Sequence, residues 1–269
     1  MQTIGFIGGG NMAEALIKGI ILAKVYKPKN IFVSDIKPQR LEFLSENFKI
    51  QTLSSNKELV KRADIVILSV EPQQLSGVLT DIKESIKADT LFISIAAGKK
   101  IDVIKGVLGD IKLIRVMPNM PARIGHGLSG IYAPENAMGR IEEAVKIFSS
   151  VGKAVILEKE DMVDVITAVC GSGPAYFFLL MENMIKAAIE LGFTEERAVD
   201  VVLQTAKGSA LLAELAKTNG QTPTQLREKI VSRGGTTEAA LKVLAEGNFG
   251  GLVVSAVKRA NARSKELSS

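Results

Sequence analysis

Short apolar runs alternate with amphipathic stretches along the first 160 residues. Runs rich in β-branched residues predict strands at 3–7, 31–33, 65–68, 91–95 and 113–116, with weaker ones at 129–132 and 154–157. Helical periodicity predicts helices around 12–20, 38–48, 55–62, 73–84 and 100–108. Strands that are apolar throughout are buried on both faces, which is typical of a parallel sheet covered by helices. We therefore predict a doubly wound α/β domain over residues 1–160.

Beyond residue 160 the apolar residues recur with the 3.6-residue period of α-helices. The stretch 162–191 is apolar on most faces, so we expect it to be buried inside the protein or against a second subunit. One further helix is predicted at 194–218, and another begins at a capping box formed by Thr222 and Gln225. Two more are predicted, one from 236 to about 247 and one from Phe249 or Gly251 onward. The second domain, residues 161–269, is therefore predicted to be all-α.

A glycine-rich turn, Gly8-Gly9-Gly10-Asn11-Met12-Ala13, joins the first predicted strand to the first helix. Rossmann-type domains carry their dinucleotide fingerprint at this position. Gly8 permits the tight turn, Gly10 lets a pyrophosphate reach the backbone, and Ala13 keeps the helix close to the sheet. Most glycine triplets are ordinary turns, but strand, turn and helix together indicate a Rossmann-type dinucleotide site.

The residues after the second strand usually select between NAD and NADP. Asp35 can accept hydrogen bonds from the ribose hydroxyls, which favours NAD. Ser34, Lys37 and Arg40 can instead surround a 2′-phosphate, and Asp35 can also simply open the turn before Pro38. From these residues alone, the choice between the two cofactors stays open.

Three further segments follow predicted strands and are expected at the same ligand-binding edge of the sheet. They are 69–72 (Ser-Val-Glu-Pro), 96–98 (Ala-Ala-Gly) and 116–121 (Val-Met-Pro-Asn-Met-Pro). Prolines on both sides of Asn119 stiffen the last of them. Each segment taken alone also fits an ordinary loop.

Two segments of the helical half depart from ordinary helix chemistry. Gly171-Ser172-Gly173-Pro174-Ala175-Tyr176 places two glycines and a proline inside a helix, where they are destabilising. Such a segment usually marks a kink or the close approach of a ligand or another backbone. Residues 232–237 open a later helix with two glycines and two threonines. Bare N–H groups at a helix start attract anions, so this segment predicts a pocket for a carboxylate or phosphate.

Composition narrows the classes of function. The 34 basic residues are scattered among 29 acidic ones, which argues against a nucleic-acid surface. A basic group near the C-terminus (Lys258, Arg259, Arg263, Lys265) fits a solvated helix face. The single cysteine, Cys170, excludes an internal disulfide and fits a reducing compartment. With neither a signal peptide nor a membrane span evident, we expect a cytoplasmic protein without nucleic-acid or membrane partners.

Taken together, these segments make the chain resemble the pyrroline-5-carboxylate reductases, the enzymes of the last step of proline biosynthesis. The turn at Gly8 resembles the family's Gly-x-Gly-x-x-Ala, 69–72 its Ala-Val-Lys-Pro, and 116–121 its Val-Met-Pro-Asn-Thr-Pro. Residues 171–176 match its Gly-Ser-Gly-Pro-Ala-Tyr unchanged, and 232–237 resemble its signature Ser-Pro-Gly-Gly-Thr-Thr. The resemblance spans nearly the whole chain, and the last two motifs are the most specific.

The resemblance implies reduction of 1-pyrroline-5-carboxylate to L-proline by hydride transfer from NADPH or NADH to the imine carbon. It implies that the helical domain dimerises the protein, with some members forming larger rings such as decamers. The substrate is expected at Ser232, Gly234, Gly235, Thr236 and Thr237, with Glu160 near its ring nitrogen. Together with Asp35, the expected cofactor contacts are Gly8, Gly9, Gly10, Asn11, Met12, Ser34, Asn56, Val70, Glu71, Pro72 and Ala97.

Three residues depart from the family pattern. Glu71 replaces a lysine in the cofactor loop, which removes attraction for phosphate and, with Asp35, favours NADH. Arg233 replaces the proline of the substrate loop, which loosens the turn but adds a cation. Met120 replaces the threonine of the 116–121 segment, and the sequence shows no consequence.

The expected chemistry needs a hydride on carbon and a proton on nitrogen, so the protein mainly positions the imine against the nicotinamide. We assign Thr237 as the catalytic residue: its hydroxyl anchors the carboxylate and helps to deliver the proton, directly or through water. His126, the only histidine, fits an exposed loop, and Cys170 a small buried apolar residue. Without a Cys/His cluster we expect no metal site.

Two alternatives remain. β-Hydroxyacid dehydrogenases share a Rossmann domain and a long helix but use a lysine on that helix, whereas here no lysine follows Gly171 until Lys186. A catalytically silent nucleotide-binding regulator is conceivable because of Glu71 and Arg233. The intact Gly-Gly-Thr-Thr at 234–237 favours the enzyme.

Overall fold

The computed structural model describes residues 2–268, which divide into two compact units. The first unit runs to Pro174 and also includes the chain from Arg259 onward, and the second is Ala175–Lys258. The predicted domain boundary after residue 160 stays a prediction. The outer ends of the two predicted domains, residues 1 and 269, lie outside the described residues.

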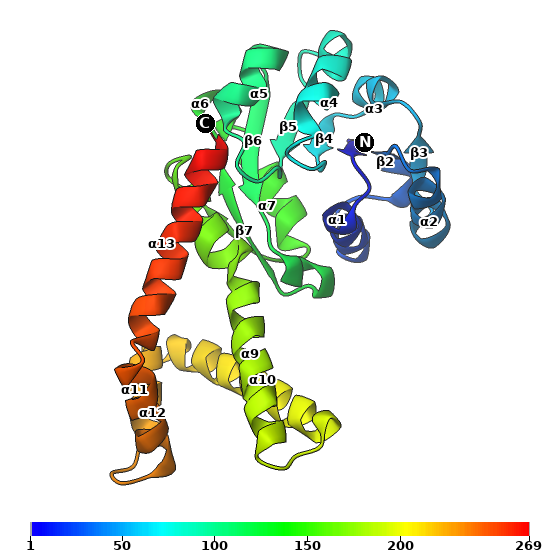
Figure 1. Cartoon of the computed structure of the whole chain (residues 1–269). Helices are drawn as coiled ribbons and strands as arrows, with labels where there is room; N and C mark the ends of the chain where they lie inside the picture. Colours follow the sequence, from blue (N-terminus) through cyan, green and yellow to red (C-terminus); the bar gives the residue numbers. More distant parts are fainter. Residues whose placement is uncertain (1, 269) are drawn as a thin grey trace. The chain divides into compact units, whose positions relative to one another are not determined.

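The first unit is built on an eight-stranded sheet in the order β3-β2-β1-β4-β5-β6-β7-β8 (Figure 1). Neighbouring strands are parallel except β6 and β7, where Val116 pairs with Ile131 in antiparallel register. The order reverses direction between β1 and β4, which is the switch point of a Rossmann fold. The strands are β1 (Ile4–Ile7), β2 (Ile31–Ser34), β3 (Gln51–Leu53), β4 (Ile65–Leu68), β5 (Leu91–Ser94), β6 (Lys112–Met117), β7 (Gly127–Tyr132) and β8 (Gly152–Ile156).

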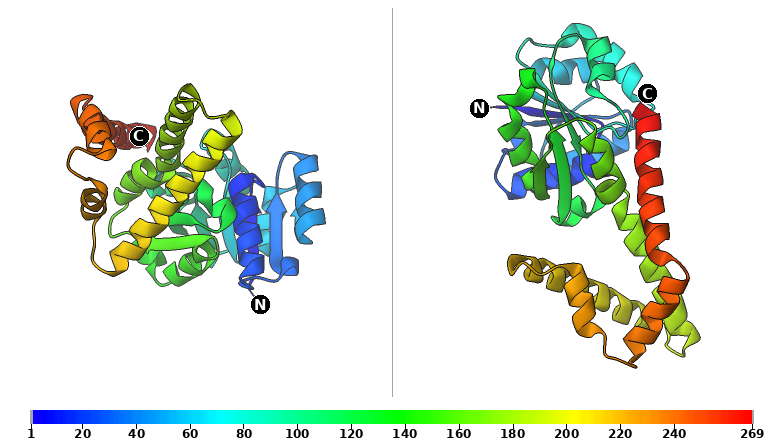
Figure 2. Two further views of the ribbon diagram at one scale, coloured as in Figure 1. Left: turned by 90° about the horizontal axis from the view of Figure 1, so that it is seen from below. Right: turned by 90° about the vertical axis from the view of Figure 1, so that its left-hand side faces the viewer.

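Helices cover both faces of the sheet (Figure 2), which confirms the predicted doubly wound α/β class. One buried cluster joins the sheet to α1, α2 and α7, and the other joins it to α3, α4 and α5. Strands β1, β2, β4 and β5 are buried along their whole length, as expected from their largely apolar sequences. The helices are α1 (Asn11–Leu22), α2 (Pro38–Phe48), α3 (Asn56–Arg62), α4 (Leu75–Ile82), α5 (Ile101–Leu108), α6 (Glu135–Met138), α7 (Ile141–Ser149) and α8 (Met162–Ile166).

Three features of this unit depart from the sequence prediction. Strand β3 was not predicted, because it is a short, partly exposed edge strand without an apolar run. Strand β7 is antiparallel to β6, since the short 3₁₀ connection (Met120–Ile124) leaves no room for a crossover helix. Helices α6 and α7 were also not predicted, although α7 buries Ile147 and Phe148.

The second unit is helical, as predicted. It comprises α9 (Gly173–Glu190) from Ala175 onward, α10 (Glu195–Thr218), α11 (Pro223–Ile230), α12 (Thr236–Glu246) and the first part of α13 (Phe249–Ser268). Thr194 caps α10 by accepting the Arg197 N–H, and Thr222 forms the predicted capping box with Gln225. In α9, Phe177 is 65% exposed and Phe178 55%, so the chain alone does not bury this helix. This exposure favours burial of α9 against a second subunit, which stays a prediction.

The last ten residues of α13 pack on the first unit. The Ser264 hydroxyl donates to Asp164 Oδ1 at 2.7 Å, and Leu267 lies against Gly98 so closely that a Cβ there would stand 2.7 Å from Leu267 Cβ. Residues 259–268 thus belong to the same compact unit as the sheet.

Candidate active site

The Gly8 turn has the geometry of a dinucleotide-binding turn. Gly8 has a φ of +97°, and an added Cβ would lie 2.7 Å from the Ser69 carbonyl oxygen, so only glycine fits without strain. Its N–H donates to the Ser34 carbonyl at 2.8 Å. Gly10 precedes α1 and offers no side-chain cap, which leaves the first N–H groups of the helix for an anion.

A cleft of about 870 Å³ lies along the carboxyl ends of β1, β2 and β4. Ligands of doubly wound sheets bind at this edge, beside the switch point. Nine expected cofactor residues line the cleft: Gly8, Gly10, Asn11, Met12, Ser34, Asp35, Asn56, Val70 and Glu71. The remaining three, Gly9, Pro72 and Ala97, do not line it. Ile36, Lys37, Arg40, Gln74 and Ile95 also contribute, and Ile95 extends the cleft to β5.

Asp35 holds the glycine turn in place. One carboxylate oxygen accepts the Gly9 N–H at 2.7 Å and the other accepts the Lys37 N–H at 2.9 Å. Asp35 therefore opens the turn before Pro38 and also lines the cleft, while its contact with the ribose stays a prediction. A carboxylate oxygen can accept more than one hydrogen bond, so Asp35 keeps acceptor capacity for ribose hydroxyls.

Two other polar side chains at this end of the cleft, Ser34 and Arg40, bond to groups of the protein. The buried Ser34 hydroxyl donates to Asn56 Oδ1 at 2.7 Å. Arg40 donates to the Gly9 carbonyl, forms an ion pair with Glu14, and lies 5.0 Å from the centre of the Phe43 ring. Arg40 thus stabilises the turn from outside as well as lining the cleft.

Glu160 lies in the loop before α8, and its carboxylate bonds both to the first residue of α5 and to a buried arginine. Its Oε1 accepts the Ile101 N–H at 2.8 Å and a bond from Arg115 at 3.1 Å. Arg115, on β6, also donates to the fully buried Asp164 at 3.3 Å. The sequence analysis missed Arg115 and Asp164, although an arginine inside an otherwise apolar strand is a usable signal.

The expected substrate loop, residues 232–237, lies in the second unit. Gly234 has a φ of +72°, and a Cβ on Gly235 would lie 2.3 Å from Ser232 Oγ, so both positions favour glycine. No side chain caps the α12 start. The Gly235 N–H donates to the Ser232 carbonyl at 3.0 Å, and the Gly234 N–H to Glu238 at 2.6 Å, an acceptor the sequence analysis missed.

The loop therefore keeps a defined set of donors for an anion. The N–H groups of Thr236 and Thr237, in the first turn of α12, have no helical acceptor. Their hydroxyls add two more donors, and the side chain of Arg233 is exposed beside them. These groups suit a carboxylate, because the positive end of the helix dipole supports negative charge there.

Of the two residues that the sequence analysis set aside, His126 lies as expected, whereas Cys170 is less buried than expected. His126 is exposed in the loop before β7. Cys170 is half-buried, and burial raises the pKa of its thiol, which favours the protonated, less nucleophilic form. Within residues 2–268, no group of three or more His, Cys, Asp or Glu side chains is placed to hold a metal ion.

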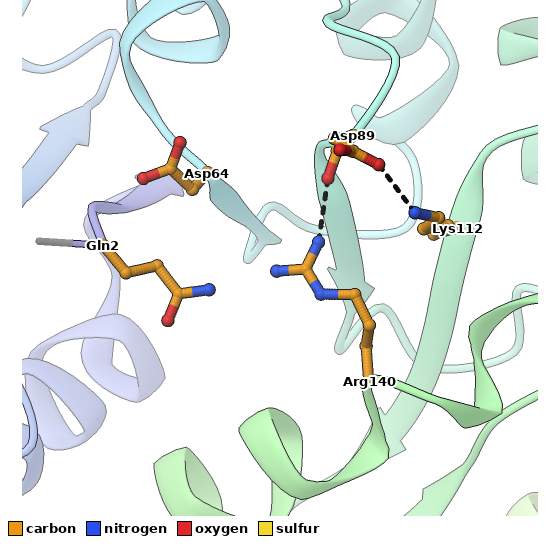
Figure 3. A pocket seen from close by; sticks show the side chains of 5 residues that line it. All are labelled: Gln2, Asp64, Asp89, Lys112 and Arg140. Carbon is orange, nitrogen blue, oxygen red and sulfur yellow. Dashed lines mark hydrogen bonds and ion pairs between the residues drawn. The ribbon is translucent and has the colours of Figure 1, made fainter.

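A second hollow, of about 560 Å³, lies at the opposite edge of the sheet and is lined by Gln2, Asp64, Asp89, Lys112 and Arg140 (Figure 3). Lys112 pairs with Asp89 at 2.7 Å and lowers the pKa of that carboxyl. Arg140 donates to the Asp89 carbonyl at 2.8 Å. Because its charges neutralise one another away from the glycine turn, this hollow is no part of the active site.

The comparisons with known proteins agree with this geometry. Residues 160–267 match the pyrroline-5-carboxylate reductase dimerisation family, and residues 3–98 match a family described as coenzyme F420-dependent NADP oxidoreductases. A pyrroline-5-carboxylate reductase from Pseudomonas aeruginosa is 40% identical over 98% of this chain and 96% of its own. The chain belongs to the pyrroline-5-carboxylate reductase family.

Solved structures of this reductase family have the same fold over the whole chain. The reductase from Coxiella burnetii is 37% identical, with a TM-score of 0.90 over 100% of this chain and 99% of its own. The Plasmodium falciparum reductase, solved with NADP bound, is 33% identical, with a TM-score of 0.89 over 100% and 98%. The predicted family, fold class, activity and NAD(P)H cofactor are thereby confirmed: the protein reduces pyrroline-5-carboxylate to proline.

Proposed function

We propose that this reductase transfers hydride from NADH or NADPH, bound in the Gly8 cleft, to the imine carbon of pyrroline-5-carboxylate held by the 232–237 loop. The uncapped start of α12, with Gly234 at a φ of +72°, is the observation that carries the substrate assignment. The assigned substrate contacts are Ser232, Gly234, Gly235, Thr236, Thr237 and Glu160. The assigned cofactor contacts are the nine expected residues that line the cleft, together with Gly9, Pro72 and Ala97.

The proposed chemistry divides between carboxylate binding and proton delivery. Thr236 and Thr237 bind the carboxylate through N–H and hydroxyl donors, which fixes the ring against the nicotinamide. Thr237 is the catalytic residue, because its hydroxyl both anchors the carboxylate and organises the proton that reaches nitrogen. Glu160 supplies negative charge near the nitrogen, which favours the protonated imine, the form that accepts hydride.

The function is tested by following oxidation of NADH and of NADPH with pyrroline-5-carboxylate as substrate. We expect imine-dependent oxidation of at least one cofactor, and no reduction of NAD or NADP with a 3-hydroxy acid. A protein that binds nucleotide but leaves the imine unchanged with both cofactors would instead be the silent regulator, and our assignment would be wrong.

We further propose that NADH is the preferred cofactor. Two carboxylates, Asp35 and Glu71, line the cleft, and each repels the additional phosphate of NADPH. We expect Glu71→Lys to raise kcat/KM for NADPH by about three- to tenfold relative to NADH, as the reversal of one partly screened charge predicts. Glu84→Lys makes the same charge change after α4, away from the cleft, and should leave the ratio unchanged. An unchanged ratio in Glu71→Lys, or equal wild-type efficiencies, would refute the preference.

The matched dimerisation family shows that the chain carries a homo-oligomerisation domain. We propose a homodimer in which the exposed apolar side chains of α9 are buried, with assembly into a decamer as a further step. By length and composition, the stretch Met162–Glu190 could also cross a membrane. However, it lies within the dimerisation region and is interrupted by Pro174, so we assign it to the subunit interface and the protein to the cytoplasm. Light scattering of the purified protein gives the oligomer size.

A further inference from the structure

The helical path changes between α8 and α9. Residues 167–171 form a π-turn, in which the Ser172 N–H donates to the Thr167 carbonyl at 2.8 Å. Pro174 follows three residues after the π-turn. In an α-helix the N–H of residue 174 would bond to the Cys170 carbonyl, but proline has no N–H. The Cys170 carbonyl therefore loses its usual helical donor.

The side chain of Asn119 supplies a replacement donor. Its Nδ2 donates to the Cys170 carbonyl at 3.3 Å and lies 3.1 Å from the Cys170 sulfur. Asn119 is far from Cys170 in sequence and lies two residues after the end of β6. A carbonyl that is shielded from water and has no partner is unfavourable, so this bond stabilises the irregular turn.

The other end of the same amide continues the β-sheet. The register of β6 and β7 pairs Met117 with Gly130, so two residues further on Asn119 would face Leu128. The backbone leaves the ladder there, but Asn119 Oδ1 accepts the Leu128 N–H at 2.9 Å. The Cys170 thiol in turn donates to the Leu128 carbonyl at 3.5 Å. One side-chain amide thus takes the place of a peptide group between a strand and a helix, and these two neighbours fix which way it faces.

This bridge lies where the nicotinamide half of the cofactor is expected. Strands β4, β5 and β6 are parallel neighbours, so their carboxyl ends lie at one edge of the sheet, beyond the switch point. The cleft reaches Ile95, directly after β5, and Asn119 follows the next strand. In a Rossmann fold the second half of the sheet carries the second mononucleotide. π-Turns, moreover, are frequent at functional sites.

We propose that Asn119 is a positioning residue for hydride transfer, because it fixes the turn Gly171-Ser172-Gly173 at the nicotinamide end of the cleft. This inference rests on the proposed function. It assigns Asn119 no contact with substrate or cofactor, since it acts through the Cys170 carbonyl. Asn119 should therefore affect kcat more than cofactor binding, and its effect should depend on Pro174.

The test combines Asn119→Ala, Pro174→Ala and the double variant in the full-length enzyme. Alanine at 174 restores the N–H that the Cys170 carbonyl lacks, so it should replace the donor lost with Asn119. We expect Asn119→Ala to lower kcat at least tenfold while changing the NADH dissociation constant less than threefold. The double variant should then recover to within about threefold of Pro174→Ala alone. If kcat of the double variant fell by the product of the two fold-decreases seen in the single variants, the two changes would be independent and the proposal would be overturned.

A second readout needs no turnover. Cys170 is the only cysteine, so the rate of its reaction with a thiol reagent reports the opening of this turn alone. We expect that rate to rise several-fold in Asn119→Ala and to return toward the wild-type value in the double variant. An unchanged rate in Asn119→Ala would overturn the proposal. If the wild-type enzyme failed to reduce the imine, the proposed function would fall, whereas the thiol rates would still decide how the turn is held.

Two further variants keep the test independent of folding. Asn119→Asp retains the acceptor for the Leu128 N–H but removes the donor to Cys170, so it should reproduce the Asn119→Ala effects even if alanine unfolds the hairpin. Asn136→Ala removes a similar bond, which the Asn136 amide donates from α6 to the carbonyl of Ile111, just before β6. It should change neither kcat nor the thiol rate, and an Asn136 effect equal to that of Asn119 would show that any lost amide suffices.

Discussion

Replacing Arg115 with alanine is expected to lower the free energy of unfolding by about 3–5 kcal/mol, the usual effect of removing one partner from a buried ion pair. The Arg115 side chain is 2% exposed and holds two carboxylates, Glu160 at 3.1 Å and Asp164 at 3.3 Å. Among residues 2–268, its loss leaves the fully buried Asp164 with the Ser264 hydroxyl as its side-chain partner, and an uncompensated buried charge is strongly unfavourable. Urea unfolding at one fixed protein concentration, monitored by circular dichroism, measures the change.

Lys112 provides the matched control for Arg115. It lies on the same strand and also pairs with an aspartate, but its partner Asp89 is 94% exposed. Lys112→Ala should therefore leave stability nearly unchanged, because exposed pairs contribute little. Arg115→Met combined with Asp164→Asn removes both charges and should recover much of the loss. Equal stabilities of Arg115→Ala and Lys112→Ala would contradict the buried network.

Replacing Thr237 with valine is expected to lower kcat/KM for pyrroline-5-carboxylate by about 100-fold, or about 2.7 kcal/mol of transition-state stabilisation. Valine keeps the branched shape of threonine and removes only the hydroxyl. That hydroxyl belongs to the few donors left at the α12 start, since Glu238 takes the Gly234 N–H and Ser232 the Gly235 N–H. Steady-state kinetics with saturating NADH separates the loss into kcat and KM.

Two controls distinguish a loss of binding from a loss of structure. Thr237→Ser keeps the hydroxyl and should retain activity within about tenfold. Thr224→Val makes the same change at the second residue of α11 and should leave kcat/KM unchanged. An unchanged kcat/KM in Thr237→Val would rule out this hydroxyl as carboxylate anchor and proton organiser. A higher KM with an unchanged kcat would show that the Thr237 hydroxyl binds the substrate but does not help to deliver the proton.

Much of the fold could be predicted because the elements that form it carry local signals. The buried strands β1, β4 and β5 are largely apolar runs, and residues such as Thr222 mark helix starts by their capping chemistry. Strand β3 escaped prediction because an exposed edge strand needs no apolar run. The antiparallel direction of β7 escaped because direction depends on the length of the connection and on pairing partners, which a periodicity does not report.

The candidate site was predictable to a similar degree and for similar reasons. Gly8 and Gly234 occupy backbone conformations that exclude most other residues, so they leave a readable pattern. Most of the expected cofactor residues line one cleft, since they follow strands whose carboxyl ends share one edge. The sequence did not predict Glu238 as a partner of Gly234, because glutamate in the first turn of a helix is common for reasons unrelated to a site.

The sequence by itself determined the reductase family, the doubly wound sheet, the helical second half and the two glycine-bounded helix starts. Each of these depends on neighbouring residues whose backbone preferences are local. Only the tertiary structure decided which polar groups meet: Asp35 with the Gly9 N–H, Arg115 with Glu160 and Asp164, and Asn119 with Cys170 and Leu128. Many residue types can satisfy a buried donor or acceptor, and the partner is chosen by the packing that brings distant segments together.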